Sequence, residues 1–203
     1  MAARTQEKYQ VRFAWGTAGA DRIAHDTHLV VWVDVLPDTR DAARGADPVA
    51  RARAAAGLLP DGPEVVLGHL GNASAVAERV TSLQAGRGDR CVVAVVAAGR
   101  STSAAADVAD AAGEPTDTGD VPEPAVEDLL AAGAVVDALI AVGIDHTSPE
   151  AAAACAAYTG LRRAVKHLVS AAEGAAGLER ETVHAALAAG PDLVVLRESS
   201  ASA

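Results

Sequence analysis

The sequence predicts a single α/β domain of three layers, α/β/α, with a mostly parallel or mixed central sheet. Strand-like and helix-like segments alternate along the chain, which is typical of such sheets. The run at 91–98, and that at 29–36 except for Asp34, are apolar on both strand faces, as in strands covered by helices on both sides. Half of the 203 residues are apolar but only 2% are aromatic, so alanine and valine must supply most of the packing.

The strands are predicted from short apolar runs bounded by glycine, proline or polar residues. Residues 9–15 alternate between apolar and polar side chains, which predicts a strand with one buried face. The run LVVWVDVL at 29–36 is apolar except at Asp34 and predicts a central strand. Further strands are expected at 64–67, 91–98 and 192–197.

Helices are predicted in the alanine-rich segments between these strands, over 41–57, 73–83, 123–142, 148–172 and 178–189. Ser148 and Pro149 form a helix start, with serine as the N-cap and proline at the first helical position. The polar residues 101–122 predict a long loop. We expect the domain to span 9–197, with a flexible N-terminus at 1–8 and a disordered tail at 198–203.

The formal net charge of −10 opposes binding to nucleic acid and to anionic membranes. A small anionic substrate would need local cations or a metal ion to offset this charge. No run reaches the roughly 18 apolar residues of a membrane span, and the first residues lack the apolar core of a signal peptide. Cys91 and Cys155 form no CxxC pair, so we interpret them as reduced thiols of a cytoplasmic protein.

Asp34 is a carboxylate in an otherwise apolar strand, where its burial is costly unless it is paired or binds a metal ion. It lies near the carboxyl end of its strand, where open α/β sheets bind ligands. One interpretation is therefore a Mg²⁺ ligand or catalytic carboxylate. The other is an aspartate that caps the turn at Pro37 and Asp38.

The stretch EVVLGHLGNASAVAERV at 64–80 passes from a strand to a helix through Gly68 and Gly71. Glycines let the backbone approach a ligand, and the free N–H groups of a helix N-terminus favour an anion. Asn72 and Ser74 are equally suited to capping the helix. The spacing leaves both interpretations open, and His69 is expected to be a solvent-facing turn residue.

Charged residues in two further segments are candidates for the functional site. Glu127 and Asp128 fall in the first turn of the helix after the long loop, where the helix dipole favours acidic residues with or without a ligand. Arg100 directly follows the strand at 91–98 and could pair with a phosphate or sulfonate. The alternative for Arg100 is an ordinary surface arginine.

Six segments occur in a familiar order: QVRFAWGTAGA (10–20), LVVWVDVL (29–36), LGNASAVAE (70–78), VVAVVAAGR (92–100), VEDLLAAGAVVDAL (126–139) and SPEAAAA (148–154). Together they resemble the 2-phosphosulfolactate phosphatase family. The similarity is collinear from about residue 9 to residue 197. NASAVAE and EDLLAAGA are its most specific parts.

The resemblance implies an α/β/α fold and Mg²⁺-dependent hydrolysis of 2-phospho-3-sulfolactate or a similar small phosphorylated hydroxy acid, a step toward coenzyme M. It matches Asp34 to the family's DVL motif, Asn72 and Ser74 to its NAS turn, and Glu127 and Asp128 to its ED pair. It thereby implies catalytic roles for Asp34 and Glu127, Mg²⁺ ligation by Asp34, Glu127 and Asp128, and substrate binding by Asn72 and Ser74. Gly71 in the same turn and Arg100 at the strand end are the further candidates for substrate binding.

The chain also differs from the family. The segment 37–63 is shorter and lacks polar, glycine-bearing loops of the kind that hold metal and phosphate, and Ala14 stands where an acidic residue is frequent. The alternative is therefore a catalytically degenerate member that binds a small anion or a protein partner. A strand lost with the missing segment would expose a sheet edge, which favours a homodimer.

Overall fold

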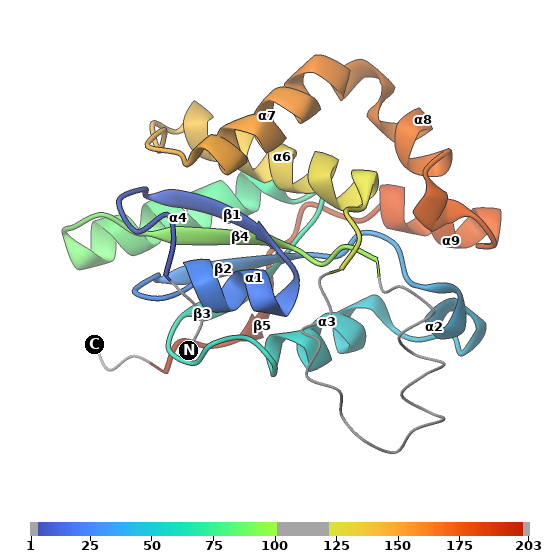
Figure 1. The fold of residues 1–203 in the computed structure, drawn as a ribbon, viewed down its shortest axis with the longest axis horizontal. Coiled ribbons are helices and arrows are strands. Elements are labelled where there is room, and N and C mark those ends of the chain that lie inside the picture. Colours follow the sequence, from blue (N-terminus) through green and yellow to red (C-terminus); the bar gives the residue numbers. More distant parts are fainter. Residues whose placement is uncertain (1–3, 101–121, 201–203) are drawn as a thin grey trace.

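The computed structural model describes residues 4–100 and 122–200, and its centre is a five-stranded sheet of order β1-β4-β2-β3-β5 (Figure 1). The strands are β1 (Val11–Trp15), β2 (Leu29–Val33), β3 (Glu64–Gly68), β4 (Val93–Ala97) and β5 (Val194–Arg197). The first four run parallel to one another, whereas β5 runs antiparallel to β3. The predicted α/β fold with a mostly parallel sheet is therefore confirmed.

Helices cover both faces of the sheet, with α4, α6 and α7 above it in Figure 1 and α1 and α3 below. The helices are α1 (Gly16–Ile23), α2 (Thr39–Ala43), α3 (Pro48–Ala56), α4 (Ala73–Arg87), α6 (Val126–Ala141), α7 (Pro149–Leu161), α8 (Val165–Ser170) and α9 (Arg180–Leu187), with 3₁₀ turns η1 (Arg162–Ala164) and η2 (Glu173–Ala175). Alternate residues of β2 enter two separate cores: Val31 and Val33 pack in the upper one, Val30 and Trp32 in the lower one.

The neighbouring strands β2 and β4 send the chain to opposite faces of the sheet. After β2 the chain enters α2 and α3, and α3 packs in the core below the sheet. After β4 the next described helix is α6, which packs in the core above it. Such a divergence between adjacent parallel strands leaves a crevice at their carboxyl ends, where open α/β sheets bind ligands.

Strand β1 is buried on both faces, so the prediction of one buried face was wrong. It packs against α1 on one side and α7 on the other. Arg12 is buried there because its guanidinium donates to the carbonyl oxygens of Ile23 and His25, at 2.8 Å each. A polar residue in an alternating pattern is therefore compatible with burial when backbone acceptors surround it.

Two long predicted helices are interrupted. The expected helix at 41–57 is split into α2 and α3, because Asp47 caps a new helix by accepting from the Ala50 N–H and Pro48 follows it. The expected helix at 148–172 is broken by η1. Its predicted start is confirmed, since Ser148 Oγ accepts from the Ala151 N–H at 3.1 Å.

The two ends of the described chain contact the domain. The Thr5 N–H donates to the Arg22 carbonyl oxygen, and Ser199 Oγ donates to that of Gly62. The predicted loop at 101–122 lies, except for Pro122, outside the described residues. Within the described ranges, none of the helices combines the length and apolar character that crossing a membrane requires.

Candidate active site

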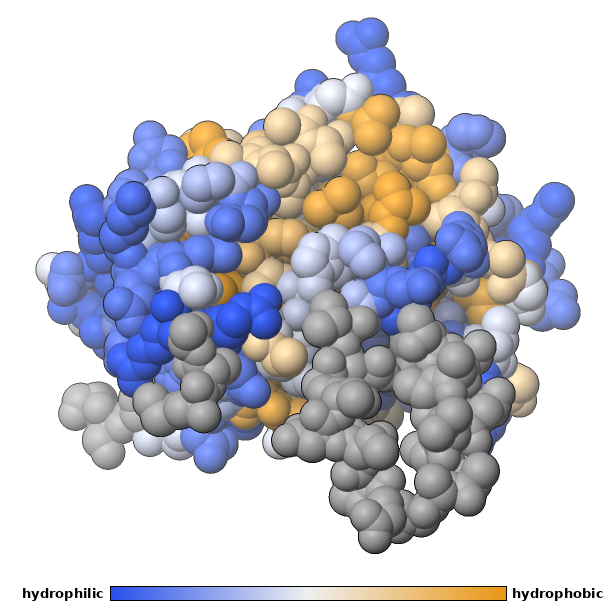
Figure 2. Space-filling view, in the orientation of Figure 1, coloured by the Kyte–Doolittle hydropathy of each residue, from blue (hydrophilic) through white to orange (hydrophobic). Residues whose placement is uncertain are grey.

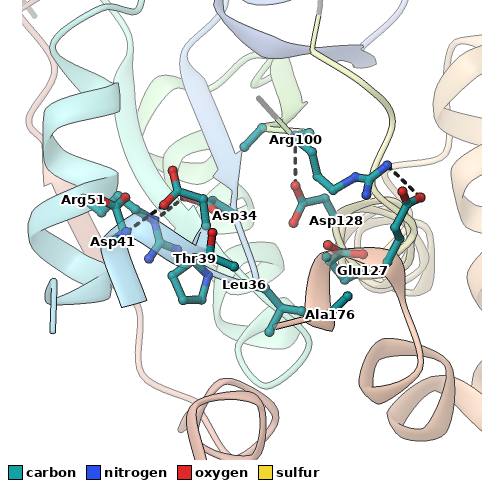
Figure 3. Close-up of a pocket in the computed structure, with 15 residues that line it drawn as sticks. Asp34, Leu36, Thr39, Asp41, Arg51, Arg100, Glu127, Asp128 and Ala176 are labelled. Atoms are coloured by element: carbon teal, nitrogen blue, oxygen red, sulfur yellow. Dashed lines mark hydrogen bonds and ion pairs between the residues drawn. The ribbon is translucent and has the colours of Figure 1, made fainter. Parts of the chain in front are cut away.

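A pocket of about 260 Å³ opens at the carboxyl ends of β2 and β4, where the chain diverges. It is lined on one side by Asp34, Asp41 and Arg51, and on the other by Arg100 and the start of α6 (Figure 3). Its carboxylate-bearing residues are Asp34, Asp38, Asp41, Glu127, Asp128 and Glu173. The structure thus brings together four of the predicted site residues, Asp34, Arg100, Glu127 and Asp128.

Asp128 is held in the site by backbone hydrogen bonds that both of its carboxylate oxygens accept. Oδ1 accepts from the Val35 N–H at 2.8 Å, just beyond β2, and Oδ2 accepts from the Gly99 N–H at 2.9 Å, just beyond β4. The side chain is 3% exposed. It therefore links the ends of the two strands to α6 and fixes the geometry of the pocket.

Asp34 follows the last residue of β2 and forms a largely buried ion pair with Arg51 of α3. Arg51 Nε donates to Asp34 Oδ2 at 2.8 Å, and each side chain is 15% exposed. Arg51 Nη1 is also buried, and it has no hydrogen-bond partner among the described residues. A buried donor is costly to leave without an acceptor, so a bound anion or water at this atom would be stabilised. In the turn that follows, Asp38 caps α2 by accepting from the Asp41 N–H, and the alternative that Asp34 caps the turn at Pro37 and Asp38 stays a prediction.

The carboxylates of the pocket disfavour one another's charge. Burial raises the pKa of Asp34, against the lowering effect of its hydrogen bond from Arg51. Burial also raises the pKa of Asp128 well above its ordinary value, and the negative charge of Asp34 adds to this. The pKa of Glu127 is raised by burial, while Arg100 opposes the shift. A cation in the pocket would relieve all three.

Arg100 lies on the far side of the pocket between two glutamates. Its Nη2 contacts Glu123 Oε2 at 3.1 Å and Glu173 Oε2 at 3.0 Å. Glu127 is buried beside Gly174, where any Cβ would collide with the Glu127 carboxylate. Arg51 and Glu173 were not predicted as site residues, because neither lies near a strand end or in a motif of the sequence.

The structure does not bring Gly71, Asn72 and Ser74 to this pocket. Asn72 is fully buried: its Oδ1 accepts from the His69 N–H, and its Nδ2 donates to the carbonyl oxygens of Leu67 and Asp192. Asn72 occupies the N-cap position of α4, but its side chain forms no cap bond, so the alternative that this side chain caps the helix was wrong. The amide instead fastens the turn to β3 and to the chain before β5.

Carboxylates are the ligands that Mg²⁺ prefers, and the like-charged group of Asp34, Glu127 and Asp128 suits a divalent cation in chemistry. In the part of the chain that the structure describes, however, no three ligating side chains form a group that could hold a metal ion. The donor set therefore fits Mg²⁺ by type and charge, without a preformed coordination shell.

Comparison with known proteins adds no independent support for a function. Neither the models of known protein families nor the curated protein sequences gave a match to this chain. The relationship to 2-phosphosulfolactate phosphatases thus stays a prediction that depends on the motifs quoted above.

Proposed function

We propose that this protein is a Mg²⁺-dependent phosphatase of small phosphorylated hydroxy acids, with 2-phospho-3-sulfolactate as the substrate that the resemblance implies. The observation that carries the proposal is that the pocket combines groups that favour ligands of both signs. Asp34, Glu127 and Asp128 have raised pKa values, which favours a cation, whereas Arg51 Nη1, which has no partner among the described residues, favours an acceptor such as a phosphoryl oxygen. A phosphate bound together with a divalent cation supplies both.

In this proposal Asp34, Glu127 and Asp128 would hold the metal ion. Mg²⁺, when bound, neutralises phosphoryl oxygens and favours attack by water. Arg51 Nη1 and Arg100 would bind the phosphoryl group, and Asp128 would keep the ends of β2 and β4 in place through its two backbone bonds. Hydrolysis breaks the P–O bond to the alcohol and forms one to the water oxygen, and the proton from water ends on the released hydroxyl.

A second candidate is a catalytically degenerate protein of the same fold that binds a small anion or a protein. It is favoured because both arginines of the pocket are already paired, Arg51 with Asp34 and Arg100 with Glu123 and Glu173. The lack of a preformed three-ligand group among the described residues points the same way. An active enzyme must instead exchange these ion pairs for substrate and metal contacts.

The test is release of inorganic phosphate from 2-phospho-hydroxy acids, including 2-phospho-3-sulfolactate, with Mg²⁺ and then with EDTA. We expect turnover with Mg²⁺ that EDTA abolishes and that Asp34→Asn and Glu127→Gln each lose. Asp21→Asn and Glu78→Gln are matched controls, because both side chains are exposed on helices away from the pocket. Folded protein that releases no phosphate would sink the enzyme and leave the binding protein.

We also infer a cytoplasmic location, because both cysteines are free thiols and burial raises the pKa of the Cys91 thiol to about 11. A homodimer stays a proposal as well. The β1 edge is partly covered, since the Val11 N–H donates to the His146 carbonyl oxygen and the Ser148 N–H to that of Val11. Pairing with a second copy is therefore favoured at β5, the opposite edge.

A further inference from the structure

A second cavity, of about 540 Å³, adjoins the carboxylate pocket and shares Asp34 and Pro37 with it. Its walls come from α2 and the start of α3, the end of β3, and α9. The two pockets therefore lie side by side, with Asp34 and Pro37 lining both. A volume of this size accommodates a substantial organic group.

The walls of the cavity are mainly small apolar side chains, including Val49, Leu67, Ala185, Ala189 and Val194. None of the described residues that line it is a lysine or an arginine. Asp34 and Asp192 contribute negative charge instead. A sulfonate or second carboxylate would therefore find no counter-charge there, whereas an apolar group would gain from leaving water.

His69 lines the same cavity and does not supply the missing positive charge. Its Nδ1 accepts a hydrogen bond from the Gly71 N–H at 3.2 Å, which assigns the remaining proton to Nε2. Burial lowers the pKa of the His69 imidazole, so the ring is neutral at pH 7. It offers one donor but no charge to a ligand.

The wall formed by the end of α9 is held by close packing at Gly71. A Cβ on Gly71 would collide with the carbonyl oxygen of Ala189, so only glycine permits this approach. Asn72 adds a bond across the same junction, from Nδ2 to the Asp192 carbonyl oxygen at 3.4 Å. The turn from Gly68 to Ser74 thus supports a wall of the second cavity and does not line the carboxylate pocket.

We propose that this cavity receives an apolar substituent of the substrate, so that the substrate is a 2-phospho-hydroxy acid with an alkyl or aryl side chain in place of a sulfonate. This inference rests on the proposed phosphatase activity, and it replaces the sulfonate substrate that the family resemblance implies. Hydrolysis breaks the P–O bond to the oxygen on C2 and forms a P–O bond to water. The products are inorganic phosphate and the free 2-hydroxy acid, with the apolar group unchanged.

The first experiment compares kcat/KM with Mg²⁺ for 2-phospholactate, its six- and eight-carbon homologues, and 2-phospho-3-sulfolactate. We expect kcat/KM to rise by up to about fourfold per added methylene, until the cavity is filled. We also expect the longer homologues to exceed 2-phospho-3-sulfolactate. Equal values across the series, or a preference for the sulfonate, would overturn the inference.

Ala185→Phe tests whether the preference arises in this cavity, because Ala185 lines it from α9. We expect this variant to lose the dependence on chain length. Ala188→Phe is the matched control: Ala188 is exposed at the end of the same helix and does not line the cavity. The control should retain the wild-type series, and a preference that survives in Ala185→Phe would contradict the assignment.

Saturation-transfer NMR with 1-octanol measures whether the cavity binds an apolar ligand, independently of catalytic turnover. Signal is expected for the wild type and Ala188→Phe and not for Ala185→Phe. If octanol binds in this pattern while no ester is hydrolysed, the proposed function fails and the apolar cavity stands. If esters are hydrolysed without chain-length preference and octanol does not bind, the inference fails and the phosphatase stands.

Discussion

Arg51 of α3 and Asp34 at the end of β2 form an ion pair in which each side chain is 85% buried, since each is 15% exposed. The pair joins the helix layer below the sheet to the strand end that forms the pocket. It also leaves Arg51 Nη1 without a partner among the described residues. The same contact therefore stabilises the fold and keeps a donor available for a ligand.

Replacing one partner of this pair should destabilise the protein. We expect Arg51→Met to lower the free energy of unfolding at pH 7 by about 3 kcal/mol, because it leaves the Asp34 carboxylate buried and unpaired. Adding Asp34→Asn to Arg51→Met should recover part of the loss. Urea unfolding measures this, with Arg53→Met, an exposed arginine of the same helix, as the control. Equal losses of stability in Arg51→Met and Arg53→Met would contradict a stabilising role for the ion pair.

Asp128 should make stability depend on pH. Its folded pKa is raised, so between the unfolded value near 3.8 and the higher folded value the folded state binds more protons than the unfolded state. The contribution of Asp128 to stability therefore falls as pH rises through this window. Above the folded pKa the full cost of the buried charge is present.

Asp128→Asn removes this titration, but it also loses an acceptor for one of the two backbone N–H groups. We expect the variant to be clearly less stable than the wild type near pH 4, with a difference that shrinks as pH rises. Urea unfolding at several pH values from 4 to 8 measures the difference. Asp21→Asn should keep a constant difference from the wild type, and a gap for Asp128→Asn that widens with pH would refute the assignment.

The sequence predicted the elements of the site better than its contacts. Asp34 lies near the carboxyl end of one predicted strand and Arg100 follows another, and the carboxyl ends of parallel strands meet at one edge of a sheet, so their proximity follows from the fold. Glu127 and Asp128 were predicted as site residues from their place in the first turn of a helix. Arg51 could not be predicted, because the pattern of an alanine-rich helix does not show which of its arginines faces inward.

The turn at Gly68–Ser74 shows the limit of local patterns. An asparagine directly before a helix can cap that helix, bind an anion or join two chain segments by hydrogen bonds, and the local sequence is the same in each case. Which of these occurs depends on Asp192, 120 residues away, whose carbonyl oxygen accepts from its amide. No local spacing contains that information, and the same holds for the packing of Gly71 on Ala189.

Asn72 and Ser74 should therefore respond differently to substitution. Asn72→Ala removes bonds to three backbone groups in a fully buried position and should cost about 2–3 kcal/mol of stability. Ser74→Ala, at an exposed position of α4, should change stability by less than about 0.5 kcal/mol and leave KM unchanged. Thermal unfolding and steady-state kinetics measure both. A large rise in KM for Ser74→Ala would restore the turn as a substrate site.

Mg²⁺ should stabilise the folded protein if the carboxylates bind it, because a ligand that binds only the folded state adds about 2.7 kcal/mol at a concentration 100 times its Kd. We expect the melting temperature in Mg²⁺ to exceed that in EDTA, and we expect Asp34→Asn and Glu127→Gln to reduce the increase. Asp21→Asn and Glu78→Gln should retain the full increase in melting temperature.

The increase in melting temperature with Mg²⁺ should also grow between pH 5 and pH 8, since protons compete with the metal ion for carboxylates whose pKa values are raised. An increase that is the same in all variants would place the ion elsewhere on this acidic surface. No increase at any pH would show that the carboxylates do not take up Mg²⁺, and it would favour the binding protein over the phosphatase.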